Sequence, residues 1–567
     1  MVKVSGRDQV RKGTRGTSSN SKKTAAWFGP KLLEFIGRHS LAITIALILL
    51  GSIRIVATYT VFSHTSDEPA HIAAGMEWLD KGTYTWEAQH PPLTRVMAAL
   101  GPYLLGTRSQ GKKPGFADSM WLEGDAILYK GHHYDLTLAV ARFGILPFFW
   151  IGCLVVYWWG RRYFDPAVAA IAVFAFSFEP TILAHAGLAT TDMGLTAFLG
   201  LAFLCGAIWL EEPTWKHAVY FGGAGALAIL SKFSSLLFFP ASAAAALAAW
   251  YLVSGRPKLV WSAEIRKRLP GLAVALVVAF FVIWAGYRFS FGSVDPIPFR
   301  IPAPELVRGI QEVQAHNTRG HPSYLLGEHS DSGWWYFFEV ALAVKTPIGF
   351  LGLLLIGTAL ALSDRFRMAC VPLAFSGAIL FVSAFAHINI GLRHVMPVYL
   401  GFSILVAIAI VRMLEIERPP AWSKAAVFGL AGWYAVSSLA AHPDYLPYFN
   451  ALAGSEPGNI LVDSDLDWGQ DIKRLSNRLH ELGAKEVSFN STLIADFEKE
   501  HGFPHILKIN VQTPNPGWNA VGITTWKEGR MGLGDQHMEI KLWADSIPPT
   551  ERVGKSIVMW YFPPKAR

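Results

Sequence analysis

Charged residues and cysteines are scarce in this chain of 567 residues. Charged residues make up 16% of the sequence, whereas soluble domains carry roughly 25%. The three cysteines, Cys153, Cys205 and Cys370, all lie inside apolar runs. This placement favours neither a disulfide framework nor a cysteine-ligated metal site. The sequence also has no P-loop, dinucleotide fingerprint, zinc-protease motif or nucleophile elbow in a suitable context.

Apolar residues are abundant instead. They account for 52% of the chain, the mean hydropathy is +0.31, and many apolar runs are long enough to cross a bilayer. We therefore predict a polytopic α-helical membrane protein. The net charge of +8 lies mostly in short loops, so it does not indicate a nucleic-acid partner. Residues 1–40 are rich in Ser, Thr, Gly, Lys and Arg, which predicts a disordered basic tail rather than a cleaved signal peptide.

About eleven apolar segments are predicted to span the membrane. They are 41–62, 138–159, 166–184, 193–210, 216–231, 235–253, 270–290, 336–361, 369–387, 394–412 and 423–440. Alternate loops are basic, which places the N-terminus in the cytoplasm and the C-terminus outside an inner (plasma) membrane. The basic residues are Arg161, Arg162, Lys216, Arg256, Lys258, Arg266, Lys267, Arg268, Arg365, Arg367, Arg412, Arg418 and Lys424.

This topology divides the chain into three parts. A cytoplasmic tail, 1–40, precedes a transmembrane domain, 41–440, whose long first outer loop covers 63–135. The remainder, 441–567, is predicted to form a small extracytoplasmic α/β domain. Its first unit is a strand, a helix and a second strand at 459–463, 470–482 and 487–489. Further strands are expected at 506–511, 521–526 and 556–562.

Three alternate acids lie at the predicted strand-to-helix turn of this outer domain. Asp463, Asp465 and Asp467 suggest a cation site by their spacing. The glycine and terminal glutamate of an EF-hand loop are out of place, however. Helix capping and turn formation are the alternative interpretation of the same acids.

The first outer loop carries an adjacent acidic pair, Asp67 and Glu68. One interpretation is that they cap a helix and interact with its dipole. The other is a catalytic carboxylate at the membrane surface, because adjacent acids are costly to desolvate there. Pro69 and Gly82 would delimit this helix, which is expected to lie in the interface plane, and Pro91-Pro92 begins a second one.

Four other polar residues are predicted at the same side of the membrane in short turns. They are Asp192, Lys232, Arg393 and His394. Any one of them could be an ordinary loop residue or a snorkelling side chain. Together with Asp67 and Glu68 they favour a single site.

These residues give the chain a resemblance to a known family. It resembles the phospholipid-carrier-dependent glycosyltransferases of the GT-C superfamily, which include the protein O-mannosyltransferases and the lipid A aminoarabinose transferase. The resemblance covers about 40–480, and no β-trefoil MIR domain is recognisable. The residues that carry it are Asp67-Glu68-Pro69, His90-Pro91-Pro92-Leu93, Thr191-Asp192, Lys232, Arg393-His394, Tyr445 to Asn450 and Leu461 to Asp471.

The resemblance implies transfer of a sugar from a polyprenyl phosphate donor to a hydroxyl of a lipid, glycan or protein acceptor. Asp67 is the predicted general base and Glu68 a catalytic partner. The predicted phosphate-binding residues are Lys232, Arg393, Arg95 and His394, and the predicted substrate-binding residues are His90 and Asp192. A single displacement would invert the anomeric centre. No cofactor is assigned, and the acids could also ligate a divalent metal. A flippase for lipid-linked glycans and a receptor with an outer sensor domain are the alternatives.

Overall fold

The computed structural model describes residues 29–111, 119–254, 261–363, 367–416, 420–491, 493, 495–510, 512–529 and 542–564. Several predictions lie outside these residues. They concern the tail 1–28, the end of the predicted strand at Val511, and the basic loop residues Arg256, Lys258, Arg365 and Arg418.

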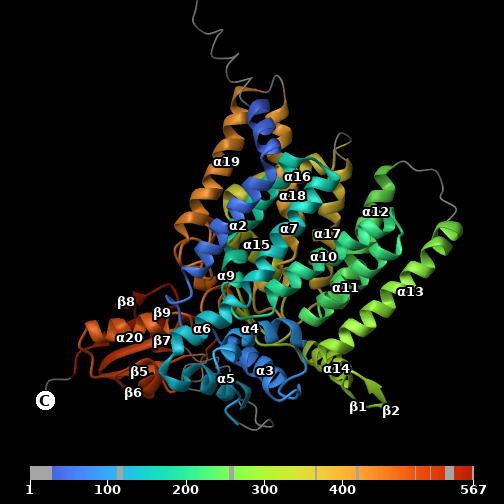
Figure 1. Ribbon diagram of the computed structural model, residues 1–567. Helices are drawn as coiled ribbons and strands as arrows, with labels where there is room; N and C mark the ends of the chain where they lie inside the picture. Colours follow the sequence, from blue (N-terminus) through green and yellow to red (C-terminus); the bar gives the residue numbers. More distant parts are fainter. Residues whose placement is uncertain are drawn as a thin grey trace, which may run out of the picture.

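Apolar helices form one bundle that makes up most of the molecule (Figure 1). Within the described residues, five helices are long and apolar enough to cross a membrane, and up to eight if three bent pairs each count as one span. The five are Tyr134–Tyr163, which joins α6 (Tyr134–Phe143) and α7 (Leu146–Tyr163), together with α10 (Asp192–Glu211), α12 (Ser235–Ser254), α13 (Trp261–Gly286) and α18 (Val398–Glu415).

The bent pairs break at short gaps between apolar helices. They are Gly29–Arg38 with α2 (Ser40–Val56), α8 (Pro166–Ser177) with α9 (Pro180–Ala186), and α15 (Phe337–Lys345) with α16 (Ile348–Ala361). Pro180 and Pro347 lie at two of the breaks, where a residue without an N–H ends the preceding hydrogen-bond ladder.

Three further helices complete the set: α11 (Trp215–Ser231), α17 (Cys370–Ser383) and α19 (Ala421–Ala440). Each of the eleven predicted spans therefore overlaps a helix or a bent pair. The prediction of a membrane protein with many apolar helices is confirmed, whereas the count of eleven spans is not.

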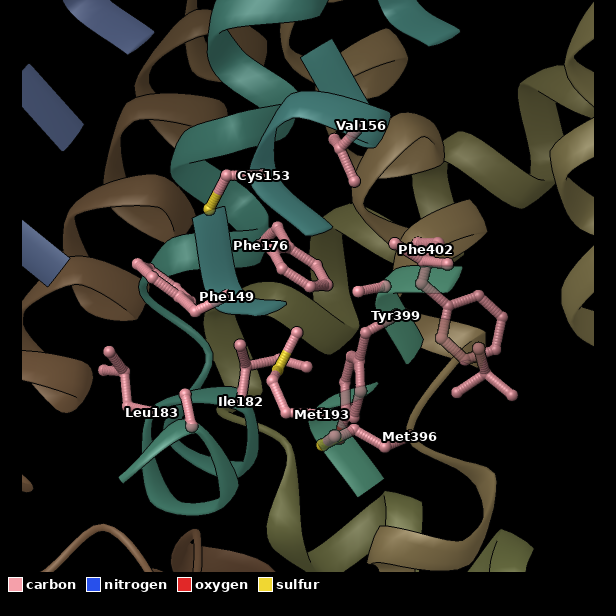
Figure 2. Packing of buried hydrophobic residues seen from close by; sticks show 14 of the residues in the cluster. Phe149, Cys153, Val156, Phe176, Ile182, Leu183, Met193, Met396, Tyr399 and Phe402 are labelled. Carbon is pink, nitrogen blue, oxygen red and sulfur yellow. The ribbon is translucent and has the colours of Figure 1, made fainter. Parts of the chain in front are cut away.

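Close packing in the bundle depends on small and aromatic residues. A Cβ atom on Gly222 of α11 would lie 2.2 Å from the carbonyl oxygen of Ala275 in α13, so only glycine permits this approach. Figure 2 shows Phe149, Met193 and Tyr399 packed in the fully buried core. These contacts fix the N-terminal ends of α10 and α18, from which polar residues extend.

The predicted first outer loop, 63–135, folds into helices at one end of the bundle. They are α3 (Glu68–Asp80), α4 (Pro92–Leu104) and α5 (Ser119–Tyr129), followed by the 3₁₀ turn η1 (Lys130–His132). The helices predicted after Asp67 and Pro91 are therefore confirmed. The position of α3 in the interface plane stays a prediction, but its apolar face does not point to lipid, because every residue from Glu68 to Glu77 is buried within the protein. Neighbouring α4 and α5 pack against α3 and cover it.

A second segment outside the long apolar helices follows α13. It consists of a hairpin, β1 (Phe291–Val294) with β2 (Ile297–Pro302), then α14 (Pro304–Arg319) and a small hairpin, β3 (Ser323–Leu325) with β4 (Glu328–Ser330). In Figure 1, the first hairpin and α14 lie at the same end of the bundle as α3.

The C-terminal part contains a five-stranded sheet in the order β6-β5-β7-β9-β8. Strand β5 is parallel to β6 and β7, whereas β9 is antiparallel to β7 and β8. The sheet lies beside the first loop at the end of the bundle (Figure 1). The strands are β5 (Glu486–Asn490), β6 (His505–Leu507), β7 (Gly517–Gly522), β8 (Glu551–Val553) and β9 (Ile557–Phe562), and the helices are α20 (Ile472–Glu481), α21 (Phe497–His501) and α22 (Ile523–Lys527).

The predicted first strand of this domain, 459–463, is wrong. The chain there makes two 3₁₀ turns, η5 (Pro457–Asn459) and η6 (Asp463–Asp465). A side chain binds its backbone in place of a neighbouring strand: the Asp463 N–H donates to the Oγ1 of Thr524, in α22 (Ile523–Lys527), at 2.8 Å. The predicted strand at 521–526 also ends early, because α22 begins at Ile523. The helix predicted at 470–482 and the strands at 487–489 and 556–562 are present.

Candidate active site

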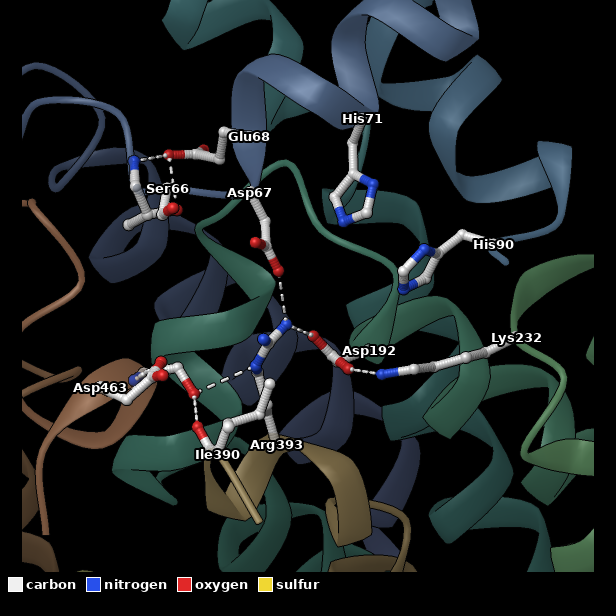
Figure 3. A network of polar contacts seen from close by, with 12 residues as sticks. Ser66, Asp67, Glu68, His71, His90, Asp192, Lys232, Ile390, Arg393 and Asp463 are labelled. Atoms are coloured by element: carbon white, nitrogen blue, oxygen red, sulfur yellow. Dashed lines mark hydrogen bonds and ion pairs between the residues drawn. The ribbon is translucent and has the colours of Figure 1, made fainter. Parts of the chain in front are cut away.

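Two acidic and two cationic side chains form an alternating chain of contacts (Figure 3). Arg393 Nη1 donates to Asp67 Oδ2 at 3.0 Å and lies 3.6 Å from Asp192 Oδ2. Lys232 Nζ donates to Asp192 Oδ1 at 2.6 Å. The structure thus brings together four of the residues predicted from separate turns. We call Asp67, Arg393, Asp192 and Lys232 the charged network.

Each member of the charged network stands at the end of a helix. Asp67 precedes α3, Asp192 begins α10 and Lys232 follows α11. Arg393 lies in the 3₁₀ turn η3 (Leu392–Val395), just before α18. Rigid helices from four parts of the sequence therefore determine the geometry of the network.

Exposure differs sharply within the network. The Asp192 side chain is fully buried, and those of Arg393 and Lys232 are 6% and 10% exposed. The Asp67 side chain is 27% exposed, so it is the carboxylate of the network that a substrate reaches most easily. Burial opposes the charge on Arg393, but Asp67 and then Asp192 outweigh this effect and raise the pKa of the guanidinium.

The capping interpretation of Asp67 does not hold. Asp67 occupies the N-cap position of α3, yet its side chain makes no capping hydrogen bond. The carboxylate instead turns toward Arg393, as Figure 3 shows. The residue therefore contributes its charge to the network rather than to the helix end.

Glu68 points in a different direction from Asp67 (Figure 3). Both of its oxygens receive hydrogen bonds from Arg142, each at 2.8 Å. The backbone N–H groups of Thr65 and Ala189 donate to the same carboxylate, at 2.7 and 2.8 Å. The side chains of Glu68 and Arg142 are 0% and 1% exposed. The structure thus places Glu68 in a closed ion pair outside the charged network.

Arg95 also lies outside the charged network, because it is held by partners from its own loop. Its Nη2 contacts the Glu87 carboxylate, and its Nη1 donates to the Tyr84 hydroxyl at 3.1 Å. His90 Nδ1 is 3.1 Å from Glu87 Oε2. Burial alone would raise the pKa of Glu87, but Arg95 and His90 reverse this and bring it to about 2. The charge of Arg95 is therefore already balanced without a phosphate.

His71 is a site residue that the sequence prediction missed. Its Nδ1 accepts a hydrogen bond from Arg95 Nε at 3.0 Å, so the ring proton is on Nε2. That buried Nε2 has no hydrogen-bond partner in the described part of the chain. Burial, then Arg95, lowers the pKa of His71 well below its usual range, so the ring is neutral. Its spacing of four residues from Asp67 on a helix could have identified it.

His394 follows Arg393, and its buried Nε2 likewise has no partner within the described ranges. This nitrogen can hydrogen-bond an oxygen of a ligand, and the role of His394 in phosphate binding stays a prediction.

The acids of the charged network do not form a metal centre. Among the described residues, no group of three or more His, Cys, Asp or Glu side chains is arranged to hold a metal ion. Asp67 and Asp192 are each occupied by a cationic side chain. The predicted option of a divalent metal therefore finds no ready ligand set in this arrangement.

Comparisons with known proteins found one matching family model and several similar solved structures. One similar solved structure is ArnT from Cupriavidus metallidurans bound to undecaprenyl phosphate, with 12% identity, a TM-score of 0.49, and coverage of 91% of this chain and 97% of that chain. Another is the Archaeoglobus fulgidus oligosaccharyltransferase in the apo form, with 14% identity, a TM-score of 0.40, and coverage of 71% of this chain and 56% of that chain. A comparison with curated protein sequences found no match. Residues 137–285 match the family described as Dolichyl-phosphate-mannose-protein mannosyltransferase. This segment carries Asp192 and Lys232, and over it the predicted resemblance to phospholipid-carrier-dependent glycosyltransferases is confirmed.

Proposed function

We propose that this protein is a membrane glycosyltransferase that uses a polyprenyl-phosphate-linked sugar. It moves the sugar to an acceptor hydroxyl at the outer face of the inner membrane, with inversion at the anomeric carbon. The observation that carries the proposal is the charged network, in which a reachable carboxylate and two cations lie together at helix ends. The family match over 137–285 supports the same reaction class.

Asp67 is the proposed general base. Its Oδ2 accepts from Arg393, which leaves Oδ1 to take a proton from the acceptor hydroxyl. The acceptor oxygen then attacks the anomeric carbon as the bond from that carbon to the phosphate oxygen breaks. The products are the glycosylated acceptor, the free polyprenyl phosphate and a protonated Asp67.

Lys232 and Arg393 are the proposed phosphate ligands. The planar guanidinium can bind two phosphate oxygens, and the ammonium group acts as a point charge. Asp192 holds both cations in place before the donor arrives, because it contacts Lys232 at 2.6 Å and Arg393 at 3.6 Å. The two cations then stabilise the charge that develops on the leaving phosphate.

The residues outside the charged network take supporting roles in this proposal. Glu68 anchors the loop that carries Asp67, through its pair with Arg142. Arg95 fixes the ring of His71, whose free Nε2–H faces the site and can donate to a sugar hydroxyl. His90 stays with Glu87, at the edge of the sugar position.

The same proposal includes the predicted topology. The N-terminus lies in the cytoplasm, eleven segments cross the membrane, and 441–567 forms an extracytoplasmic domain. The first loop and the five-stranded sheet lie at one end of the bundle (Figure 1), and Asp67 joins this loop to the charged network, which supports a common side. Reporter fusions after Arg268 should be cytoplasmic, and fusions after Pro322 and Ser464 should be external. A cytoplasmic signal after Ser464 would contradict this topology.

Sugar transfer by the purified protein is the deciding experiment. A polyprenyl phosphate donor with a radiolabelled sugar is incubated with the protein and a hydroxyl acceptor in detergent or liposomes, and the release of the labelled sugar from the lipid phosphate is measured. We expect release with the wild-type protein and a large loss with Asp67→Asn. A flippase would move the intact lipid between leaflets without cleaving it, and that result would replace our proposal. A parallel reaction with a chelator, and with metal added back, tests metal dependence.

A further inference from the structure

The segment Asp463–Gln470, here called the Trp468 segment, touches the charged network from the C-terminal part of the chain. The Arg393 guanidinium carbon lies 4.2 Å from the centre of the Trp468 ring, in cation–π contact. Arg393 Nε also donates to the Ser464 hydroxyl at 3.1 Å. With one face and one nitrogen of the guanidinium held in this way, its Nη1 is directed to Asp67 and Asp192.

The same segment holds the backbone of the turn that carries Arg393. The Leu392 N–H donates to the Asp465 carboxylate at 3.2 Å, next to Arg393. The Ser464 hydroxyl, which accepts from Arg393, itself donates to the Ile390 carbonyl, and Figure 3 shows Ile390 beside Arg393. The side chain and the backbone of this turn therefore have a common support.

The other end of the Trp468 segment binds the loop that carries Asp67. The Ser66 N–H donates to the Trp468 carbonyl, and the Ser63 N–H donates to the Gln470 carbonyl, both at 3.0 Å. The Lys473 N–H, at the start of α20, donates to the Ser63 hydroxyl at 2.8 Å. The segment thus contacts the chain immediately before the proposed base.

The Trp468 segment is itself rigid. The Gln470 side chain accepts from the Trp468 N–H and donates to the Leu466 carbonyl, both at 2.8 Å. Asp467 accepts from the Thr524 N–H at 3.0 Å, which fixes the segment to the start of α22. Gly469 has φ +91°, and a Cβ there would lie 2.5 Å from the Leu493 side chain, so this turn requires glycine.

We infer that Trp468 is a positioning residue that joins the two halves of the active site. Its ring holds Arg393, and its carbonyl holds the loop of Asp67, so the base and the phosphate ligand keep their separation. This inference rests on the proposed function and adds to it a role for the C-terminal part of the chain. The relative position of donor and acceptor in the reaction would then depend on a segment outside the charged network.

Binding of undecaprenyl phosphate and the rate of sugar transfer test the inference in the full-length protein. Trp468→Leu removes the aromatic face while keeping an apolar side chain, and we expect binding about tenfold weaker together with a lower kcat. Trp468→Phe keeps an aromatic face and should bind within about threefold of wild type. Ser464→Ala, which removes only one hydroxyl, should weaken binding in the same direction, and it remains informative if Trp468→Leu does not fold.

Trp543→Leu is the matched control. Trp543 is buried in the core of the C-terminal sheet, 5.0 Å from the Trp560 ring, and does not contact the charged network. This change should lower the melting temperature while leaving the Kd for undecaprenyl phosphate unchanged. Equal losses in Trp543→Leu and Trp468→Leu would refute the inference, because the effect would then be general destabilisation. Wild-type binding and turnover in both Trp468→Leu and Ser464→Ala would refute it as well.

Failure of the inference can be separated from failure of the proposed function. If the wild-type protein transfers sugar and Lys232→Ala weakens lipid phosphate binding, the function stands whatever Trp468 does. If the wild-type protein transfers no sugar and binds no undecaprenyl phosphate, the proposed function itself fails.

Discussion

Replacing Glu68 with Gln should destabilise the protein without removing a catalytic group. Glu68 and Arg142 have side chains that are 0% and 1% exposed, and their atoms meet at 2.8 Å. Glutamine keeps the size of the side chain but loses the charge. The change therefore isolates the buried ion pair from the packing around it.

The expected loss of stability follows from the hydrogen bonds that the Glu68 carboxylate makes. Its carboxylate accepts hydrogen bonds from Nε and Nη2 of Arg142 and from the backbone N–H groups of Thr65 and Ala189. A glutamine amide has one accepting oxygen, so its NH₂ group must face some of these donors. Arg142 would then remain buried with an uncompensated charge. Breaking a buried pair from one side costs about 3–5 kcal/mol in the free energy of unfolding.

Thermal unfolding in detergent, followed by the loss of a monodisperse peak, is the assay. Glu211→Gln is the matched control, since Glu211 also meets an arginine at 2.8 Å but its side chain is 46% exposed. That exposed pair contributes about 0–1 kcal/mol. Glu68→Gln should lower the melting temperature by several degrees more than Glu211→Gln. A Glu68→Gln protein that is as stable as wild type but inactive would refute this reasoning and return Glu68 to a catalytic role.

Three other perturbations test the site and its surroundings. Asp67→Asn should lower turnover by about a hundredfold or more. The melting temperature should stay near normal, because Asp67 does not cap α3, and undecaprenyl phosphate binding should not weaken, because Arg393 loses a counterion. Near-normal transfer would eliminate Asp67 as the base. Lys232→Ala should weaken both lipid phosphate binding and the transfer rate, and an effect on the rate alone would exclude it as a ground-state phosphate ligand. Burial and, to a lesser extent, the charge of Glu500 raise the pKa of Asp125 from 3.8 to about 8. Between these pH values the folded protein keeps a proton on Asp125 that the unfolded chain loses. The free energy of unfolding should therefore fall as the pH rises through this range. Asp125→Asn should flatten this slope in melting temperatures measured across that range, and an unchanged slope would show that Asp125 does not titrate in this way.

Local signals in the sequence were enough to predict several elements. Pro69 and Gly82 delimit α3, and Pro92 starts α4. These helix ends were predictable because each depends on residues within one turn of it. The apolar spacing that predicted a helix at 470–482 reflects the buried face of α20. The predicted sharing of one site was also informative, since Asp67, Asp192, Lys232 and Arg393 do contact one another.

The ion-pair partner of each charged residue could not be predicted from the sequence, because the two residues of a pair lie far apart in the chain or in separate turns. Asp67 and Glu68 are adjacent, and nothing in their order says which one meets Arg393 and which one meets Arg142. Arg95 looked like a free cation until the fold placed Glu87 against it. The false strand at 459–463 has the same origin, since Leu461 packs in the core of the helix bundle and Val462 packs against side chains of the sheet without joining its strands.

The charges of the site also explain why a base and two cations belong in one network. Asp67 and Asp192 balance Arg393 and Lys232, so the network is neutral before the donor binds. In the proposed reaction the leaving phosphate gains one negative charge as its bond to the sugar breaks. Asp67 loses one negative charge at the same time by accepting the acceptor's proton, so the total charge of the buried site is unchanged. When Asp67 is neutral, Arg393 has lost the more exposed of its two counterions, so its positive charge stabilises the phosphate more strongly. The contact between Asp67 and Arg393 therefore couples proton removal at the acceptor to stabilisation of the leaving group.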